Sequence, residues 1–338
     1  MYETKVLKCN SEGIEKAAEL LKAGETVAIP TETVYGLAAN ALDEKAVKQI
    51  FEVKGRPQDN PLIVHISDIS MWGKLVKEVT PDALKLAECF WPGPLTMILP
   101  KSDLVPDTTT AGMDSVAVRM PSHEGARAII AASGLPIAAP SANLSGLPSP
   151  TSAEHCVKDL SGKIPLIIDG GHCTVGIEST VVSLCGEPIV LRPGAITPEM
   201  LSAALGKEVG ISHTAVEPMA AGEKPLSPGM KYRHYAPKAK LVLVESTAEA
   251  FAELLNGSPE GTYGLIFEDD AKLMTKPCIA YGKEHDAESQ AREVFAALRE
   301  LDDSGAQLIY ARCPDRDEAS LGVFNRMLRA AAFEVIKL

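Results

Sequence analysis

The chain has 338 residues, of which 46% are hydrophobic and 23% charged, a composition typical of folded globular proteins, and its length predicts two domains. A formal net charge of −12, from 33 basic and 45 acidic side chains, argues against a free-standing nucleic-acid binder, because neutralising phosphates needs a basic surface. No stretch approaches the roughly 18 apolar residues of a membrane span, and the N-terminus has no apolar signal core, so we expect a cytoplasmic protein without membrane contact.

Helix and strand patterns alternate through the N-terminal part of the chain. Asn10 or Ser11 can cap a helix that ends at Gly24, and Asp43 can cap a second helix. Thr151 and Glu154 form a capping box for a third helix, which runs to about Leu160. The expected strands are 26–29, 62–66, 96–99, 115–119, 137–139, 166–168, 179–184 and 188–191. Some of them follow one another without room for a crossover helix, which predicts a mixed sheet.

The pattern changes after residue 206. Residues 207–239 show little periodicity and contain helix-breaking prolines, so they are interpreted as a linker. Alternation then resumes, with predicted strands at 241–244, 263–267 and 307–310 and predicted helices at 247–256, 286–301 and near Asn325. This order predicts a small, Rossmann-like parallel sheet covered by helices. The expected division is therefore 1–206, linker 207–239, and 240–338.

Two cations stand close together where the second predicted helix ends. Lys54 and Arg56 flank a glycine and precede an Asn60–Pro61 turn. A mobile lysine charge and a planar arginine fork together suit a polyphosphate. The alternative is a solvated helix end, where cations favour the helix dipole; this segment taken alone favours that alternative.

Hydroxyl and amide side chains follow two of the predicted strands. Thr31, Thr33 and Tyr35 come after the strand at 26–29, and Ser141 and Asn143 come after the strand at 137–139. Ligands of open α/β sheets collect at such strand ends. A polar loop with a packed tyrosine, and a plain turn, would produce similar patterns.

Two polar residues interrupt apolar strands. Arg119 ends the strand 115–119, where a cation needs either an internal carboxylate or a bound anion. His65 lies in the strand 62–66 and by itself suggests a structural histidine. Arg192 is a further arginine at a strand end.

Several common catalytic motifs are absent from the sequence. It contains no Walker loop, GxSxG, HExxH or GxGxxG, so a nucleotide would have to be held by side-chain cations. Its seven cysteines include no CxxC pair, and we expect reduced thiols that fill space. The dipeptide His155–Cys156 recurs as His172–Cys173, but nothing fixes zinc geometry there, and no metal ligand is assigned.

Six ordered segments together resemble the L-threonylcarbamoyl-adenylate synthase family. They are PTETVYGLA (30–38), KGRPQDNPL (54–62), VAVRMP (116–121), APSAN (139–143), GIESTVV (176–182) and LRPGAI (191–196). The resemblance covers about residues 12–206, and the segment Ser227–Pro237 resembles the linker of the long, two-domain branch. It implies a twisted α/β catalytic domain with a concave, positively lined cavity, similar in fold to double-stranded RNA binders. It also implies a nucleotidyltransferase that converts threonine, bicarbonate and ATP into threonylcarbamoyl-adenylate and pyrophosphate, for tRNA modification.

The resemblance also implies roles for individual residues. Lys54 and Arg56 are expected to hold the triphosphate. The rest of the expected ATP site is Asn60, Thr110, Ser141, Asn143, Ser149, Arg192 and Tyr235. The expected threonine site is Thr33, His65, Arg119, the Ala139 backbone and Ser179, and the expected lid is Tyr232, His234 and Tyr235. Magnesium is expected to arrive with ATP and to need few protein ligands.

The implied partners are ATP, L-threonine and bicarbonate, with a downstream tRNA threonylcarbamoyl transferase as a further candidate. Direct tRNA binding is expected to be weak or absent. One alternative is an RNA-binding module without ATP turnover, and another is a carbamoyl-transfer enzyme that uses carbamoyl phosphate. Against the second alternative, this sequence lacks the zinc-binding cysteine spacing that such enzymes carry. The sequence predicts no role for the C-terminal domain.

Overall fold

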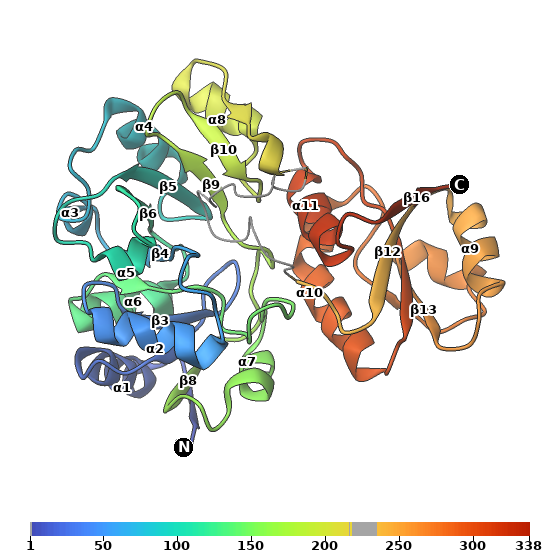
Figure 1. Ribbon diagram of the computed structural model, residues 1–338, viewed down its shortest axis with the longest axis horizontal. Helices are drawn as coiled ribbons and strands as arrows, with labels where there is room; N and C mark the ends of the chain where they lie inside the picture. The colour runs from blue at the N-terminus through green and yellow to red at the C-terminus, as the bar shows by residue number, and fades with distance from the viewer. Residues whose placement is uncertain (1, 216, 218–234) are drawn as a thin grey trace.

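The computed structural model describes residues 2–215, 217 and 235–338. Figure 1 shows two α/β bodies lying next to each other, the larger coloured from blue to yellow and the smaller from orange to red. Each is built around its own β-sheet, one mixed and one parallel. The predicted fold class, a mixed-sheet α/β domain followed by a small parallel α/β domain, is confirmed.

The larger body contains an eleven-stranded sheet in the order β1-β8-β2-β3-β7-β4-β6-β5-β9-β10-β11. Its strands are β1 Lys5–Lys8, β2 Val27–Ile29, β3 Gly36–Asn40, β4 Ile63–His65, β5 Leu95–Pro100, β6 Ser115–Arg119, β7 Ile137–Ala138, β8 Leu166–Asp169, β9 Thr180–Ser183, β10 Ile189–Arg192 and β11 Gly210–Ile211. Its helices are α1 Ser11–Lys22, α2 Glu44–Lys54, α3 Ile69–Trp72, α4 Pro81–Phe90, α5 Asp107–Thr110, α6 Glu124–Ser133, α7 Ala153–Leu160 and α8 Pro198–Leu205, followed by a 3₁₀ helix, His213–Ala215.

The smaller body contains a five-stranded sheet in the order β14-β13-β15-β12-β16, with every neighbouring pair parallel. Its strands are β12 Lys240–Glu245, β13 Thr262–Ile266, β14 Cys278–Ala280, β15 Leu308–Arg312 and β16 Val335–Lys337. Its helices are α9 Ala248–Asn256, α10 Ala287–Asp303 and α11 Leu321–Ala330, with a 3₁₀ helix at Glu268–Leu273. Helices α10 and α11 lie on the side that faces the larger body (Figure 1).

Side-chain caps account for most of the predicted helix starts. Asn10 accepts a hydrogen bond from the backbone of Gly13 at the start of α1, and Asp43 accepts from two amides at the start of α2. The predicted cap of α7 is wrong by one residue. Ser152 accepts from the amide of His155, whereas Thr151 is buried before the helix begins.

Helix α2 connects the hydrophobic core to the cationic segment. Its buried Val47, Ile50 and Phe51 belong to the same cluster as Leu62 and Val118 of the sheet region. The helix ends in a left-handed Gly55, a conformation that glycine adopts without a steric penalty. The core therefore fixes where Lys54 and Arg56 leave the helix. None of the helices in the described part of the chain has both the length and the apolar composition of a membrane span.

Candidate active site

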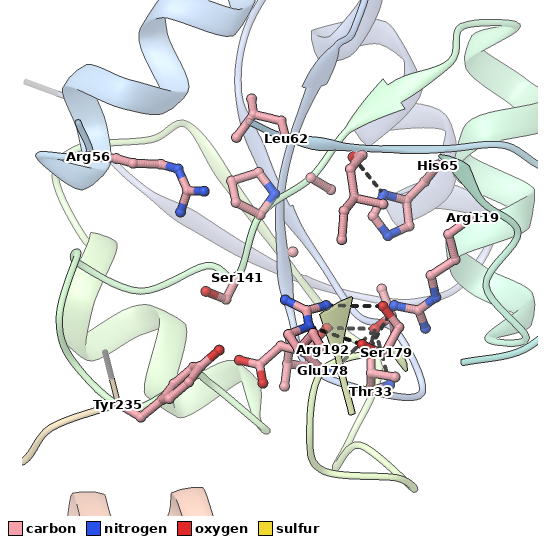
Figure 2. A pocket seen from close by; sticks show the side chains of 16 residues that line it. Thr33, Arg56, Leu62, His65, Arg119, Ser141, Glu178, Ser179, Arg192 and Tyr235 are labelled. Atoms are coloured by element: carbon pink, nitrogen blue, oxygen red, sulfur yellow. Dashed lines mark hydrogen bonds between the residues drawn. The ribbon is translucent and has the colours of Figure 1, made fainter. Parts of the chain in front are cut away.

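A pocket opens over the middle of the larger sheet. Its walls come from segments in or next to strands β2, β4, β6, β7, β9 and β10. The lining residues are Thr31, Thr33, Val34, Gly36, Arg56, Leu62, Ile63, His65, Arg119, Ala139, Pro140, Ser141, Glu178, Ser179, Arg192 and Tyr235. Figure 2 shows Arg56, Ser141 and Tyr235 on one side and His65 and Arg119 on the other, with Arg192 and Ser179 between them.

Arg119 is the cation on the strand β6 side of the pocket. It is 3% exposed and forms an ion pair with Glu32, with 2.7 Å between Nη2 and Oε1. Its Nη1 donates to Thr33 Oγ1 over 2.9 Å, and its Nε donates to the carbonyl of Gly93. Burial alone would raise the pKa of Glu32, but the Arg119 charge holds that pKa below its usual value. Arg119 thus has an internal carboxylate partner and also lines the pocket.

His65 lies beside Arg119 because β4 and β6 are parallel and pair these two residues. Its Nδ1 lies 3.2 Å from the carbonyl oxygen of Ile63. Burial and then the Arg119 charge lower the pKa of His65 to about 3. The ring is therefore neutral at physiological pH.

The ring-carbon NMR signals of His65 are expected to stay unchanged from pH 8 down to pH 5 (about neutral to mildly acidic). His285 provides an internal control, since it is exposed and its hydrogen bond to Asp315 raises its pKa. Because the folded pKa of His65 lies below its unfolded value, the unfolded state binds the proton first as the pH falls. Stability should therefore decrease from about pH 6.5 toward pH 3, and His65→Gln should decrease less steeply. Simultaneous titration of both histidines would contradict the neutral assignment.

Arg192 lies near the centre of the pocket, at the end of β10. Its Nε donates to the carbonyl of Ser179 over 3.1 Å, and its Nη2 donates to the hydroxyl of the same serine over 3.2 Å. That hydroxyl also lies 2.8 Å from the hydroxyl of Thr96. Burial lowers the pKa of Arg192 to about 10, so it remains a cation at neutral pH.

Arg56 lies at the opposite wall, beyond Gly55. Its guanidinium donates to the backbone carbonyls of Asn60 and Pro61 over 3.4 and 3.1 Å. These contacts fold the side chain back over the Asn-Pro turn, on the side of the pocket where Ser141 lies (Figure 2). The pocket thus has cationic groups on both sides and between them.

The structure brings together nine of the residues that the sequence analysis assigned to the site. These are Thr33, Arg56, His65, Arg119, Ala139, Ser141, Ser179, Arg192 and Tyr235. Tyr232 and His234 lie outside the described residues, so the lid stays a prediction. Tyr35, which the sequence left open between ligand contact and packing, is fully buried and donates to the carbonyl of Gly171.

Five assigned residues lie outside the lining: Lys54, Asn60, Thr110, Asn143 and Ser149. Lys54 is 2% exposed, and its ammonium donates to the carbonyls of Ser141 and Asn143. Burial and then the Arg56 charge hold the pKa of Lys54 well below its usual value.

The other four occupy distinct positions. Asn60 is buried with both polar atoms of its amide unpaired among the described residues. Thr110 donates to the carbonyl of Met113 over 3.0 Å. The Asn143 amide donates to the carbonyls of Leu144 and Leu147, within its own loop. Ser149 donates to the carboxylate of Glu178, so it contacts a residue of the pocket wall.

Two carboxylates at the pocket were not predicted from the sequence. Glu178 lines it, and Glu32 holds Arg119 from behind. Glu32 lies in the segment noted for the hydroxyls of Thr31 and Thr33, and Glu178 lies in the segment 176–182, which was noted only for the family resemblance. Neither segment reveals from its sequence which arginine its carboxylate binds. Across residues 2–215, 217 and 235–338 there is no group of three or more His, Cys, Asp or Glu that could hold a metal ion. Cys156 and Cys173 instead belong to the large hydrophobic cluster.

Comparisons with known proteins cover both bodies. A family model described as "Telomere recombination" matches residues 19–194, and one described as "Threonylcarbamoyl-AMP synthase, C-terminal domain" matches residues 196–332. The threonylcarbamoyl-AMP synthase of Pyrococcus abyssi is 45% identical over 332 residues, 96% of each chain. That of Bacillus subtilis is 45% identical over 343 residues, 99% of this chain and 97% of the relative.

A solved structure extends this similarity to three dimensions. The structure of P. abyssi Sua5 complexed with L-threonine has a TM-score of 0.90 at 42% identity, and the match covers 100% of this chain and 99% of that one. The similarity therefore includes both sheets. Two family models match in order, and the relatives are 45% identical over nearly the whole chain. The chain therefore belongs to the threonylcarbamoyl-AMP synthase family, in its long two-domain form.

Proposed function

We propose that this enzyme makes L-threonylcarbamoyl-adenylate from L-threonine, bicarbonate and ATP and releases pyrophosphate, as the first step of N6-threonylcarbamoyladenosine modification of tRNA. The observation that carries the proposal is the arrangement of cations in one pocket. Arg119 lies beside Thr33 and His65, while Arg56 lies beside Ser141 on the opposite side. This arrangement suits an amino-acid carboxylate at one end and a polyphosphate at the other.

Threonine is assigned to the side with Arg119. There Thr33, His65, Ser179 and the Ala139 backbone surround a small polar space, and the cation faces the amino-acid carboxylate. A neutral His65 can accept or donate one hydrogen bond without adding charge beside Arg119.

ATP is assigned to the opposite side and the centre. Arg56 and Arg192 are the cations that meet the phosphates, Ser141 offers a hydroxyl, and Tyr235 offers an aromatic face. Lys54, Asn60, Thr110, Asn143 and Ser149 complete the proposed nucleotide region from behind the lining. The unpaired buried amide of Asn60 supports this assignment, because such a group calls for a partner.

The reaction needs no covalent intermediate on the protein. Bicarbonate takes up a proton and loses water to give carbon dioxide. The amine of threonine attacks the carbon of carbon dioxide, loses a proton to solvent and becomes a carbamate. A carbamate oxygen then attacks the α-phosphorus, the bond to the β-phosphate oxygen breaks, and pyrophosphate leaves with the bonding pair. The protein contributes alignment of the reactants and cations that meet the developing charge on pyrophosphate.

Magnesium is proposed to enter with ATP. The two carboxylates at the described pocket, Glu32 and Glu178, are both paired with arginines. The pocket therefore fits an ion held mainly by phosphates and waters, which is how Mg²⁺ often binds. When bound, it would neutralise phosphate charge.

The product is a labile mixed anhydride, so a tRNA threonylcarbamoyl transferase is the proposed consumer. Direct tRNA binding is proposed to be weak, given the net charge of −12. We place the reaction in the cytoplasm, because the labile product must reach tRNA there.

Pyrophosphate release is the test of the proposed function. The purified chain is incubated with ATP and Mg²⁺, and threonine and bicarbonate are omitted in turn. Release that requires both, with a product of threonylcarbamoyl-adenylate mass, is expected. Release that ignores threonine would contradict the proposed reaction. No release, combined with a salt-sensitive shift of bare RNA, would favour the RNA-binding alternative.

A further inference from the structure

A side chain of the C-terminal domain packs behind the wall of the pocket. Arg326 of α11 is 0% exposed, and its Nε donates to Glu178 Oε2 over 2.8 Å. Its Nη2 donates to the backbone carbonyl of Glu178 over 2.9 Å, and its Nη1 donates to the carbonyl of Pro193 over 2.6 Å. One guanidinium thus binds the two segments that carry Ser179 and Arg192 into the pocket.

Close backbone packing fixes the position of Arg326. Gly322, one turn earlier on α11, lies so near the larger body that an added Cβ would come within 2.9 Å of Ile177 and 3.1 Å of Gly194. Farther along the helix, Arg329 donates to the carbonyl of Thr214 over 2.8 Å. Helix α11 therefore cannot slide along the wall without breaking contacts at both of its ends.

Glu178 transmits this contact to the pocket. Its side chain lines the cavity beside Arg192 and Tyr235 (Figure 2). Its other carboxylate oxygen accepts from Ser149, and the next residue, Ser179, accepts two hydrogen bonds from Arg192. A carboxylate that is 7% exposed needs a partner, and Arg326 supplies a charge-assisted one.

Tyr235 connects the pocket to the C-terminal domain a second time. Its ring centroid lies 5.2 Å from that of Phe295 on α10, and the Arg326 guanidinium carbon lies 5.9 Å from the same ring. Arg326 therefore contacts two lining residues directly, Glu178 and Tyr235. It reaches a third, Arg192, through the carbonyl of the neighbouring Pro193. Arg192 and Tyr235 belong to the part of the pocket to which ATP is assigned, and Glu178 lies beside them (Figure 2).

We propose that Arg326 is a positioning residue for the nucleotide part of the pocket, and that supplying it is a function of the C-terminal domain. The inference rests on the proposed function in one respect, the assignment of ATP to this part of the pocket. It predicts that loss of Arg326 weakens ATP binding more than threonine binding. Of the residues assigned to threonine, Ser179 lies on a segment that Arg326 binds, whereas Arg119 and His65 form no hydrogen bond or ion pair with α11 among the described residues.

The matched control is Arg299, a second buried arginine of the C-terminal domain that binds the larger body. It donates to both carboxylate oxygens of Asp159, over 3.1 and 2.7 Å, and to the carbonyl of Pro148. Neither Asp159 nor Pro148 lines the pocket. Arg326→Met and Arg299→Met each remove one interdomain ion pair, so both variants should lose stability. Only Arg326→Met removes a contact with a residue that lines the pocket.

The experiment measures the Kd for ATP by calorimetry and the KM values for ATP and threonine from pyrophosphate release. For Arg326→Met, the Kd and KM for ATP should rise about tenfold, while the KM for threonine should rise at most about threefold, through Ser179. Arg299→Met should leave all three within about twofold, with a comparable fall in Tm. If Arg326→Met does not fold, Arg326→Lys and Arg299→Lys give the same comparison, with about a threefold rise expected for Arg326→Lys alone.

Unchanged ATP affinity in the Arg326 variants, or an equal loss in the Arg299 variants, would overturn the inference. The wild-type chain in the same assays reports on the proposed function separately. Wild type that binds ATP but releases no pyrophosphate would refute the reaction, and the Kd comparison would still decide the role of Arg326. Wild type that binds no ATP would overturn both.

Discussion

Replacing Arg119 with methionine is expected to lower kcat/KM for threonine by about 100-fold or more and to destabilise the fold by about 3–5 kcal/mol. The two effects have different causes. The kinetic loss follows because the cation assigned to the threonine carboxylate is gone. The loss of stability follows because Glu32, which is 5% exposed, keeps a buried charge without its partner at 2.7 Å.

A second substitution separates these causes. Glu32→Gln in the Arg119→Met background removes the unpaired charge, so the free energy of unfolding in urea should recover substantially. Pyrophosphate release should stay low, because the double variant still lacks the cation. Recovery of both quantities would mean that Arg119 acts only through the fold. Arg316→Met, which removes a half-exposed ion pair with Glu245, is the control and should change both quantities little.

The parts of the fold that could be predicted from the sequence are those with local signals. The caps Asn10 and Asp43 and the strand at 115–119 have such signals, and each lies where the pattern placed it. Strand β3 was missed because Gly36–Asn40 contains no β-branched residue, and its strand conformation comes from pairing with β2 and β7. Edge strands β14 and β16, three residues each, are too short to show alternation.

The candidate site divides in the same way. Residue types at strand ends were visible in the sequence, and nine of the assigned residues line one pocket. Which charges pair was not visible, since Glu32 and Arg119 are 87 positions apart and Glu178 and Arg326 are 148 apart. The sequence also could not reveal that the C-terminal domain contacts the pocket wall. That contact comes from the apolar packing of α11, which local periodicity does not assign to a partner.

Lys54 can act on the triphosphate of ATP or on the loop that carries Ser141 and Asn143, and a substitution can separate these two roles. The family resemblance implies that it meets the triphosphate, whereas in the structure its ammonium donates to the carbonyls of Ser141 and Asn143. Lys54→Met is expected to lower kcat/KM for ATP about 100-fold, because the group assigned to the triphosphate is gone and the carbonyls of Ser141 and Asn143 lose their donor. Lys48→Met, an exposed change on the same helix, is the control.

Amide hydrogen exchange distinguishes how that loss arises. If Lys54 holds the loop that carries Ser141 and Asn143, the amides of residues 141–147 should exchange faster in Lys54→Met even without ATP. If Lys54 acts only on the phosphates, those amides should be as protected as in the wild type while the Kd for ATP rises. The hydrogen bonds to both carbonyls lead us to expect faster exchange together with weaker ATP binding. Unchanged exchange with unchanged kcat/KM would remove Lys54 from the site altogether, and the phosphates would then depend on Arg56 and Arg192.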